Sequence, residues 1–280
     1  MSSPQYDDAA IAAKWKEFAE AVERLAERVA DPEDLGVLAG SSIAGDDDRC
    51  HPFDLSQAVR HLINATVDQL HGIKTVLVDA DRQHLAVGFT LARAAIENTA
   101  TALWILGPTD RRTRLERVLR WHVRNYQDER QTVGHLVGNA PNDHIDQVVQ
   151  LASKLTLDSM TVAKGYKITA PIKGAEEFTD MDVNFMWSVA SGFAHGRPWA
   201  FQGLLQREHL EVAEGHKFMR LSPRTDLSIW LPLQALHLLG ELLRLREVRA
   251  GYAPSPRGNH ARPGGAFYRP EKWPTRLGIR

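Results

Sequence analysis

The sequence predicts an all-α protein, with six or seven helices in a single bundle, a small β-hairpin near residues 199–221 and an irregular C-terminal tail. Apolar residues recur every three to four positions along most of the 280 residues, which is the spacing of helices with one buried face. Glycine and proline gather between these periodic segments rather than within them. No internal repeat and no sharp change in composition divides the chain, so one helical domain is expected over residues 1–250.

The N-terminal segment, residues 1–35, is expected to form an acidic helix that precedes the core. Its apolar positions are spaced as on one helical face, and Asp31-Pro32 stops the pattern. These positions are Ile11, Trp15, Phe18, Val22, Leu25 and Val29. Residues 36–53 contain several glycines and three consecutive aspartates, and they are predicted to form a loop.

The core bundle is expected over residues 54–250. Helix-stop signals divide this region, because Gly107-Pro108 ends one periodic segment and Gly196 ends another. The periodic segments are 54–79, 83–106, 110–136, 142–157, 179–196 and 226–249. Residues 158–178 carry glycine and proline in mixed surroundings and are predicted to form a loop.

The charged residues are nearly balanced overall but differ between the two ends of the chain. The net charge is −1 with 25% charged residues, so no global field draws the protein to nucleic acid or anionic lipid. Residues 1–50 carry twelve acidic and five basic residues, whereas residues 251–280 carry six basic residues and one acidic residue. This C-terminal tail is rich in proline and glycine and is expected to lack a core of its own.

Cysteine and histidine usage points to a protein without disulfides or metal. Cys50 is the only cysteine, and no histidines are spaced as a helical ligand pair, so we expect no metal and no cofactor. The first residues lack the basic and apolar parts of a secretory signal. The most apolar stretch, residues 227–245, is interrupted by Pro232 and Glu241, as in a buried helix. A cytoplasmic protein with no membrane span is therefore expected.

Charge is scarce between Arg82 and Asp110, where Arg93 and Glu97 are the only charged residues. The rest of this segment is apolar or small nearly all round, as expected for a central helix that other helices enclose. Arg93 and Glu97 are four residues apart and share one face. Because burying an unpaired ion costs several kcal/mol, the two side chains either pair tightly or line a pocket.

A second segment, residues 183–201, contains only His195 and Arg197 as ionisable groups. Its apolar residues cover a broad arc, and its polar residues form a narrow stripe spaced i, i+4, i+7 and i+11. The stripe consists of Asn184, Ser188, Ser191 and His195. The helix dipole favours a charged His195 in the last turn and Arg197 opposes it, so this histidine is a candidate acid–base group near neutral pH.

The helix expected over residues 110–136 carries a basic stripe opposite an apolar face. The stripe consists of Arg114, Arg117, Arg120 and Arg124. We interpret it as a solvated face, with contact to phosphate groups as the alternative.

Three of these features together resemble a known group of proteins. They are an Arg-x-x-x-Glu in a central apolar helix, a later basic helix with a tyrosine, and a helix that ends in Ser-x-x-x-His-Gly. The residues are Arg93, Glu97, Tyr126, Ser191, His195 and Gly196. The pattern, over about residues 55–200, resembles the DUF5677-like families of bacterial helical proteins, which are similar to the HEPN (higher eukaryotes and prokaryotes nucleotide-binding) superfamily.

The resemblance implies a protein that acts on RNA or a nucleotide, because many HEPN proteins are metal-free ribonucleases of toxin–antitoxin or phage-defence systems. Their Arg-x(4–6)-His spacing occurs here at Arg117 with His122 and at Arg130 with His135. Chance alone produces such matches in a chain so rich in both residues. On a helical wheel His122 also lies on the apolar face and Arg117 on the polar face.

On this hypothesis His195 is the general acid or base, Arg93 or Arg197 stabilises phosphate charge, and Glu97 orients Arg93. Contacts to substrate are assigned to Asn184, Ser188, Ser191, Trp187, Trp104 and Tyr126. One alternative is a non-enzymatic interaction or scaffold protein, such as a homodimer, in which the Arg93–Glu97 pair is purely structural. Another is a small-molecule-binding protein with a pocket lined by Trp104, Trp187 and the polar stripe.

Overall fold

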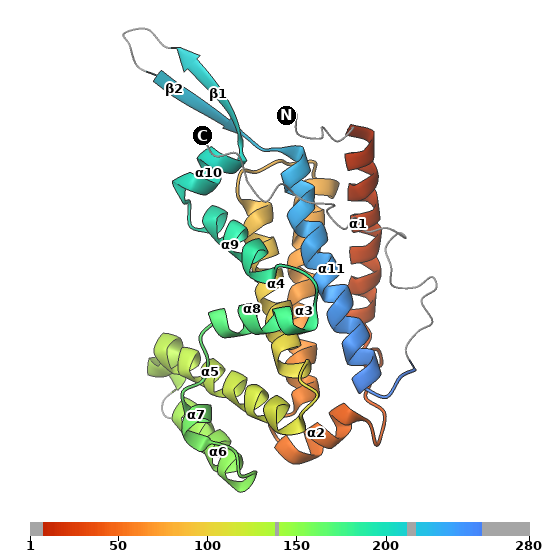
Figure 1. The fold of residues 1–280 in the computed structure, drawn as a ribbon, viewed down its shortest axis with the longest axis vertical. Helices are drawn as coiled ribbons and strands as arrows, with labels where there is room; N and C mark the ends of the chain where they lie inside the picture. The colour runs from red at the N-terminus through yellow and green to blue at the C-terminus, as the bar shows by residue number, and fades with distance from the viewer. Residues whose placement is uncertain (1–7, 138–139, 212–216, 254–280) are drawn as a thin grey trace.

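The computed structural model describes residues 8–137, 140–211 and 217–253, which contain eleven α-helices and one two-stranded antiparallel sheet (Figure 1). The α-helices are α1 (Asp8–Ala30), α2 (Ser42–Cys50), α3 (Leu55–Lys74), α4 (Val87–Leu106), α5 (Arg111–Val137), α6 (Ala140–Lys154), α7 (Ser159–Ala163), α8 (Thr169–Ala175), α9 (Val183–Ala194), α10 (Pro198–Leu204) and α11 (Thr225–Arg249). The remaining elements are a π-helical turn η1 (Thr75–Asp79), a 3-10 turn η2 (Glu176–Phe178), and strands β1 (Gln206–Glu211) and β2 (Lys217–Ser222). The predicted fold class and hairpin are confirmed.

The predicted number of six or seven helices is too low, because short helices occupy segments predicted to be loops. α2 lies within residues 36–53 and begins after Ser41, whose hydroxyl accepts a hydrogen bond from the N–H of Ala44. α7 and α8 lie within residues 158–178, and Asp158 caps α7 in the same way. These helices have five to nine residues, so they make too few turns for a helical period to be visible in the sequence.

The central element is α4, which lies among α3, α8, α9 and α11 (Figure 1). Thirteen of its twenty residues are buried, which explains why the segment has so few charges. Two polar residues inside this contact are satisfied by their own helices, since the hydroxyls of Thr66 on α3 and Thr99 on α4 each donate to the carbonyl four residues earlier, at 2.8 Å. α4 therefore lies at the centre of the core. Its residues Arg93 and Glu97 lie where the core meets the surface.

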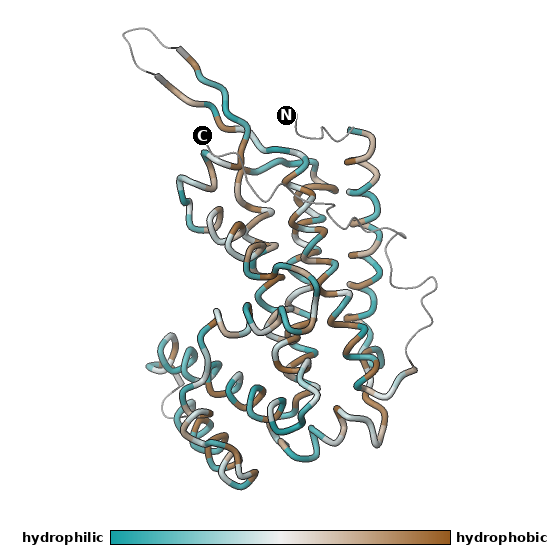
Figure 2. Tube along the Cα trace, viewed as in Figure 1, coloured by the Kyte–Doolittle hydropathy of each residue, from teal (hydrophilic) through white to brown (hydrophobic). Residues whose placement is uncertain are grey.

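α1 and α11 close one side of the bundle. The apolar positions of α1 face α3 and α11, and its polar positions face outward (Figure 2). The last turn of α11 binds main-chain carbonyls that helix ends and loops leave without partners. Arg249 donates to the carbonyls of Gly107 and Pro108, both at 2.8 Å, just beyond the end of α4. Arg246 donates to the carbonyl of Gly36 at 2.7 Å.

The basic stripe on α5 faces the protein at three of its four arginines, so its interpretation as a solvated face is wrong for them. The side chain of Arg114 is 3% exposed and binds Asp46 of α2. Arg117 and Arg120 each donate to a main-chain carbonyl, at 2.7 and 2.9 Å. Only Arg124 is exposed. The stripe thus fastens the group formed by α5, α6 and α7 to the rest of the bundle.

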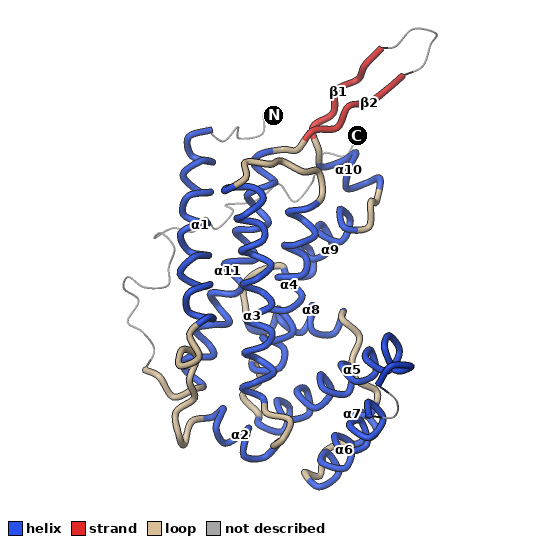
Figure 3. Tube along the Cα trace, turned by 180° about the vertical axis from the view of Figure 1, so that it is seen from behind, coloured by secondary structure: helices blue, strands red, loops and turns tan. Residues whose placement is uncertain are grey.

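The hairpin of β1 and β2 extends away from the helices in both views (Figures 1 and 3). It carries the exposed side chains of Phe218 and Met219. The tail predicted over residues 251–280 lies outside the described residues from residue 254 onward. No helix within the described ranges is long and apolar enough to cross a membrane.

Candidate functional site

α4 and α9 run antiparallel and meet in three successive layers of side chains. The contacting pairs are Phe89 with Phe193, Arg93 with Ser191, and Glu97 with Trp187. The two phenylalanine rings stack with their centroids 3.9 Å apart, which fixes the register of the two helices. The structure therefore brings together four residues that the sequence proposed for the site, two from each helix.

Arg93 is held on three sides. Its Nη2 lies 2.6 Å from Oε1 of Glu97, its Nε donates to Oγ of Ser191 at 3.0 Å, and its guanidinium lies 5.8 Å from the ring centroid of Trp187. Within the described residues its Nη1 makes no hydrogen bond. The side chains of Arg93 and Glu97 are 25% and 20% exposed. The pair is thus partly accessible to solvent, although both side chains are held in place. One amino group of the guanidinium can bind an anion from solvent.

One oxygen of Glu97 contacts two groups. Oε1 accepts a hydrogen bond from the indole N–H of Trp187 at 2.6 Å and forms the ion pair with Nη2 of Arg93. Hydrogen bonds to a charged carboxylate are stronger than those between neutral groups. Glu97 therefore positions both Arg93 and Trp187, which agrees with the orienting role expected for it.

The polar stripe of α9 is only partly used by the fold. Ser191 binds Arg93, whereas the side chains of Asn184, Ser188 and His195 make no hydrogen bond with the described part of the chain. His195 is exposed and forms the C-cap of α9, where its N–H binds the carbonyl of Ser191 at 3.0 Å. One face of α9 thus carries amide, hydroxyl and imidazole groups that the fold does not use, on the same stripe as Ser191.

The end of α9 is shaped by a tight reversal of the chain. Gly196 has φ +61°, a conformation that favours glycine, and the N–H of Arg197 binds the carbonyl of Gly192 at 2.8 Å. α10 then starts at Pro198, a residue suited to the first position of a helix. The exposed Arg197 and His195 consequently lie on the same short turn.

Trp199 also belongs to this region, although the sequence did not single it out. A Cβ atom added to Gly192 would lie 2.4 Å from the indole of Trp199, so the ring lies directly over Gly192. The residue is nevertheless 52% exposed. The signal that could have found it is Gly192, because a glycine inside a helix commonly marks a close approach by another group.

Trp104 and Tyr126 are not part of this cluster. Trp104 lies about three turns beyond Arg93 on α4, where the guanidiniums of Arg117 and Arg120 lie 5.1 and 5.5 Å from its ring centroid. Tyr126 lies on α5, with its ring centroid 4.7 Å from that of His144. The two residues stabilise the α4–α5 and α5–α6 contacts instead.

Arg117 and His122 do not form a catalytic pair. Arg117 binds the main-chain carbonyl of Trp104, and burial lowers its pKa. His122 packs on the other face of α5 against Phe53, with ring centroids 5.2 Å apart, and burial lowers its pKa to about 4. Among the described residues no group of three or more His, Cys, Asp or Glu side chains could hold a metal ion.

Replacing Glu97 by alanine is expected to lower the free energy of unfolding by about 2 kcal/mol, because a partly buried arginine and an indole N–H both lose their acceptor. Urea denaturation followed by tryptophan fluorescence measures this change. Glu116→Ala is the matched control, since Glu116 pairs with Arg120 at the same i,i+4 spacing but at 3.4 Å. That pair should cost less than about 0.5 kcal/mol. Equal losses in the two variants would show that the α4–α9 contact gains nothing from Glu97.

Comparisons with protein-family models, with curated proteins and with solved structures each gave no match, so any function must be inferred from the geometry of the α4–α9 face itself.

Proposed function

We propose that the protein acts on RNA as a metal-free ribonuclease, at the α4–α9 face and the turn that follows α9. The observation that carries this proposal is the state of Arg93. Its guanidinium is fixed by Glu97 and Ser191, while Nη1 has no partner within the described residues. His195 follows Ser191 by one helical turn and is exposed. A preorganised cation and an imidazole one helical turn from the serine that binds this cation are groups that phosphodiester chemistry can use.

The proposed reaction is attack of the RNA 2′-hydroxyl on the adjacent phosphorus. Neutral His195 takes the proton of the 2′-hydroxyl, the new bond from O2′ to phosphorus forms, and the bond from phosphorus to O5′ breaks. The leaving O5′ takes a proton from water, and the products end in a 2′,3′-cyclic phosphate and a 5′-hydroxyl. Arg93 stabilises the charge that develops on the phosphate oxygens, and Arg197 binds a neighbouring phosphate.

Support for RNA as the substrate comes from the groups around Arg93. The net charge of the chain is −1, so binding has to depend on local cations rather than on a global field. Asn184 and Ser188 offer hydrogen-bonding groups along α9, and the exposed indole of Trp199 offers a surface on which a base can stack. The resemblance to the HEPN superfamily agrees with this choice.

Replacing His195 by alanine is expected to slow cleavage of a labelled single-stranded RNA by at least about 100-fold, because the general base is removed. The unfolding midpoint should not change, since the side chain is exposed and unpartnered in the described residues. His135→Ala, a change at an exposed histidine of α5, is the control and should keep the parent rate. The assay is run with a chelator present, and the product ends are identified by mass spectrometry.

Equal rates for His195→Ala and the parent, each purified in the same way, would contradict the proposal. If no RNA binds at physiological salt while light scattering gives a dimeric mass, a non-enzymatic interaction protein is the better description. The observation that favours this second function is the projecting hairpin with Phe218 55% exposed, since an isolated two-stranded hairpin gains little stability on its own. The Arg93–Glu97 pair would then only lock α4 to α9.

A further inference from the structure

Two arginines of α5 lie at the indole of Trp104, about three turns beyond Arg93 on α4. The guanidinium carbons of Arg117 and Arg120 lie 5.1 and 5.5 Å from the ring centroid, where cation–π attraction holds them. Each side chain is also fixed by one main-chain carbonyl. Nη1 of Arg117 donates to Trp104 at 2.7 Å, and Nε of Arg120 donates to Gly165 at 2.9 Å. These two cations, the Arg117–Arg120 pair, are therefore held in place.

Three nitrogen atoms of the pair make no hydrogen bond within the described residues and reach solvent. They are Nε and Nη2 of Arg117 and Nη2 of Arg120. None of them is among the buried unpartnered atoms of the described chain, so water contacts each one. Arg117 forms no ion pair in the described structure, and Arg120 meets only Glu116, at 3.4 Å. Because charge-assisted bonds measure about 2.7–2.9 Å, the pair offers donors to solvent without a close counter-charge.

Positive charge outweighs negative charge around the pair. Burial lowers the pKa of Arg117, Glu177 opposes this, and the neighbouring charge of Arg120 adds to it. Lys164 and Lys167 are exposed on the loop after α7 that Arg120 contacts. Four cations thus lie here against the two glutamates that act on Arg117. An anion stabilises two guanidiniums that repel each other, and a phosphate has enough oxygens to bind both.

The pair lies on the same side of α4 as the proposed RNA site. Trp104 follows Arg93 by eleven residues, about three helical turns, so the two side chains leave α4 in nearly the same direction. The helices packed along this side of α4 are α9, α8 and α5, in that order (Figures 1 and 3). Eleven residues of helix measure about 16 Å, a distance that a single strand of a few nucleotides can span. The pair and Arg93 can therefore meet phosphates of one strand.

We propose that the Arg117–Arg120 pair binds a backbone phosphate of single-stranded RNA, a few nucleotides from the phosphate that Arg93 meets. The proposal rests on the proposed RNA function, and it adds that the substrate is a strand long enough to reach both places. Arginine suits such a contact because its planar N–H groups match phosphate oxygens in pairs. Phosphate contacts carry no base information, so this second contact fixes the position of the strand rather than selecting its sequence.

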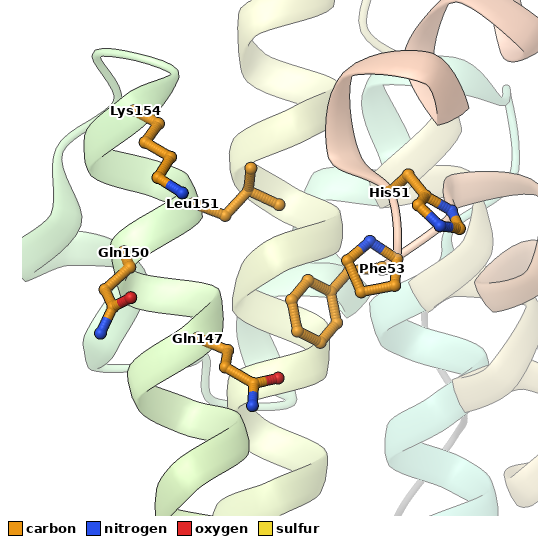
Figure 4. Close-up of a pocket in the computed structure, with 7 residues that line it drawn as sticks. His51, Phe53, Gln147, Gln150, Leu151 and Lys154 are labelled. Carbon is orange, nitrogen blue, oxygen red and sulfur yellow. The ribbon is translucent and has the colours of Figure 1, made fainter.

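The pocket shown in Figure 4 does not belong to this path. It has a volume of about 200 Å³ and lies between the turn after α2 and the outer helix α6. Phe53, which lines it, packs against His122 on the other face of α5 from Arg117. Lys154 is the only permanent charge in its lining. This residue therefore supplies a control cation that lies outside the path.

The experiment measures binding of 2′-O-methyl RNA, which has no 2′-hydroxyl to attack and so cannot be cleaved by the proposed reaction. Fluorescence anisotropy compares a labelled octanucleotide with a labelled dinucleotide on the full chain at several salt concentrations. The parent should bind the octanucleotide at least about tenfold more tightly than the dinucleotide, because only the longer strand reaches both places. The double variant Arg117→Gln with Arg120→Gln should lose that tenfold advantage. Its salt slope for the octanucleotide should fall by about 0.7 for the lost phosphate contact.

Glu116→Gln tests the same place with the opposite sign and leaves the carbonyl contacts of both arginines available. Removing this carboxylate takes a negative charge away from the bound phosphate, so the octanucleotide should bind about threefold more tightly. Lys154→Gln and Arg244→Gln remove exposed cations outside the path, and these two controls should leave the octanucleotide affinity unchanged. Circular dichroism of every variant checks that its helices are intact.

The proposal is overturned if the octanucleotide does not bind up to about 1 mM, or if neither the double variant nor Glu116→Gln changes its affinity. Cleavage of unmodified RNA by the parent separates this proposal from the proposed function. A parent that binds the octanucleotide through the Arg117–Arg120 pair but cleaves nothing would contradict the ribonuclease and support the phosphate site. A parent that cleaves, with octanucleotide affinity unchanged in both variants, would contradict the phosphate site alone.

Discussion

Replacing Asp46 by alanine should lower the free energy of unfolding by about 3–5 kcal/mol, since it leaves a buried arginine without its counter-charge. Asp46 is fully buried on α2 and holds Arg114 of α5 through contacts of 2.6 and 3.0 Å. The remaining donors of Arg114 bind Ser42 and the carbonyls that follow α4. The guanidinium cannot turn to water without breaking this whole set, so the lost charge is not replaced.

Urea denaturation of the variant and the parent measures this loss. Asp48→Ala is the matched control, because Asp48 lies two residues away on the same helix but is exposed. The double variant Asp46→Leu with Arg114→Met should recover most of the stability, as well-packed apolar residues can replace a buried ion pair. If Asp46→Ala were as stable as the parent, Arg114 would have found another partner. The Asp46–Arg114 pair would then contribute nothing to the free energy of unfolding.

The second large effect is a dependence of stability on pH that comes from His122. Its pKa is about 4 in the folded protein, against 6.5 for an unperturbed histidine, because burial disfavours the charged ring. Between these values the unfolded chain binds more protons than the folded one, so the free energy of unfolding falls as the pH is lowered through this window. The full contribution, about 3 kcal/mol, is present above pH 6.5 and is lost at about pH 4.

Urea denaturation at several pH values between 7 and 4 tests this, because carboxyl groups that also titrate there cancel in a comparison of variants. His122→Phe keeps an aromatic ring and removes the titration, so its stability should fall less steeply than that of the parent over this range. His135→Phe, a change at an exposed position of the same helix, should retain the parent profile. Parallel curves for His122→Phe and the parent would show that His122 is not kept neutral by the fold.

The sequence was sufficient for the parts of the fold that depend on one helix at a time. The scarcity of charge around Arg93 and Glu97 correctly indicated a central helix, and the spacing of the two residues placed them on one face. The contact of Arg93 with Ser191 could also be predicted, because a charged residue of a central helix needs a polar partner and α9 has one narrow polar stripe. Both inferences rest on local periodicity, which a single sequence contains.

What the sequence could not supply is the identity of the partner that a polar side chain meets. Arg114 and Arg124 look alike on a helical wheel, but one is buried against Asp46 and the other is exposed. Trp104 and Tyr126 lie on faces that pack as expected, yet their neighbours come from α5 and α6 rather than from α9. Such differences depend on contacts between distant segments of the chain, which a helical period does not contain.

The enclosure of α4 has a consequence for the order of assembly during synthesis. A ribosome adds about 5–20 residues per second, and N-terminal parts can begin to fold first. One wall around α4 is α11, which ends at Arg249, so this apolar helix stays uncovered until almost the whole described chain has been made. The N-terminal half of the nascent polypeptide therefore cannot reach its final packing alone, and the apolar surface of α4 remains exposed to aggregation until α11 has been synthesised.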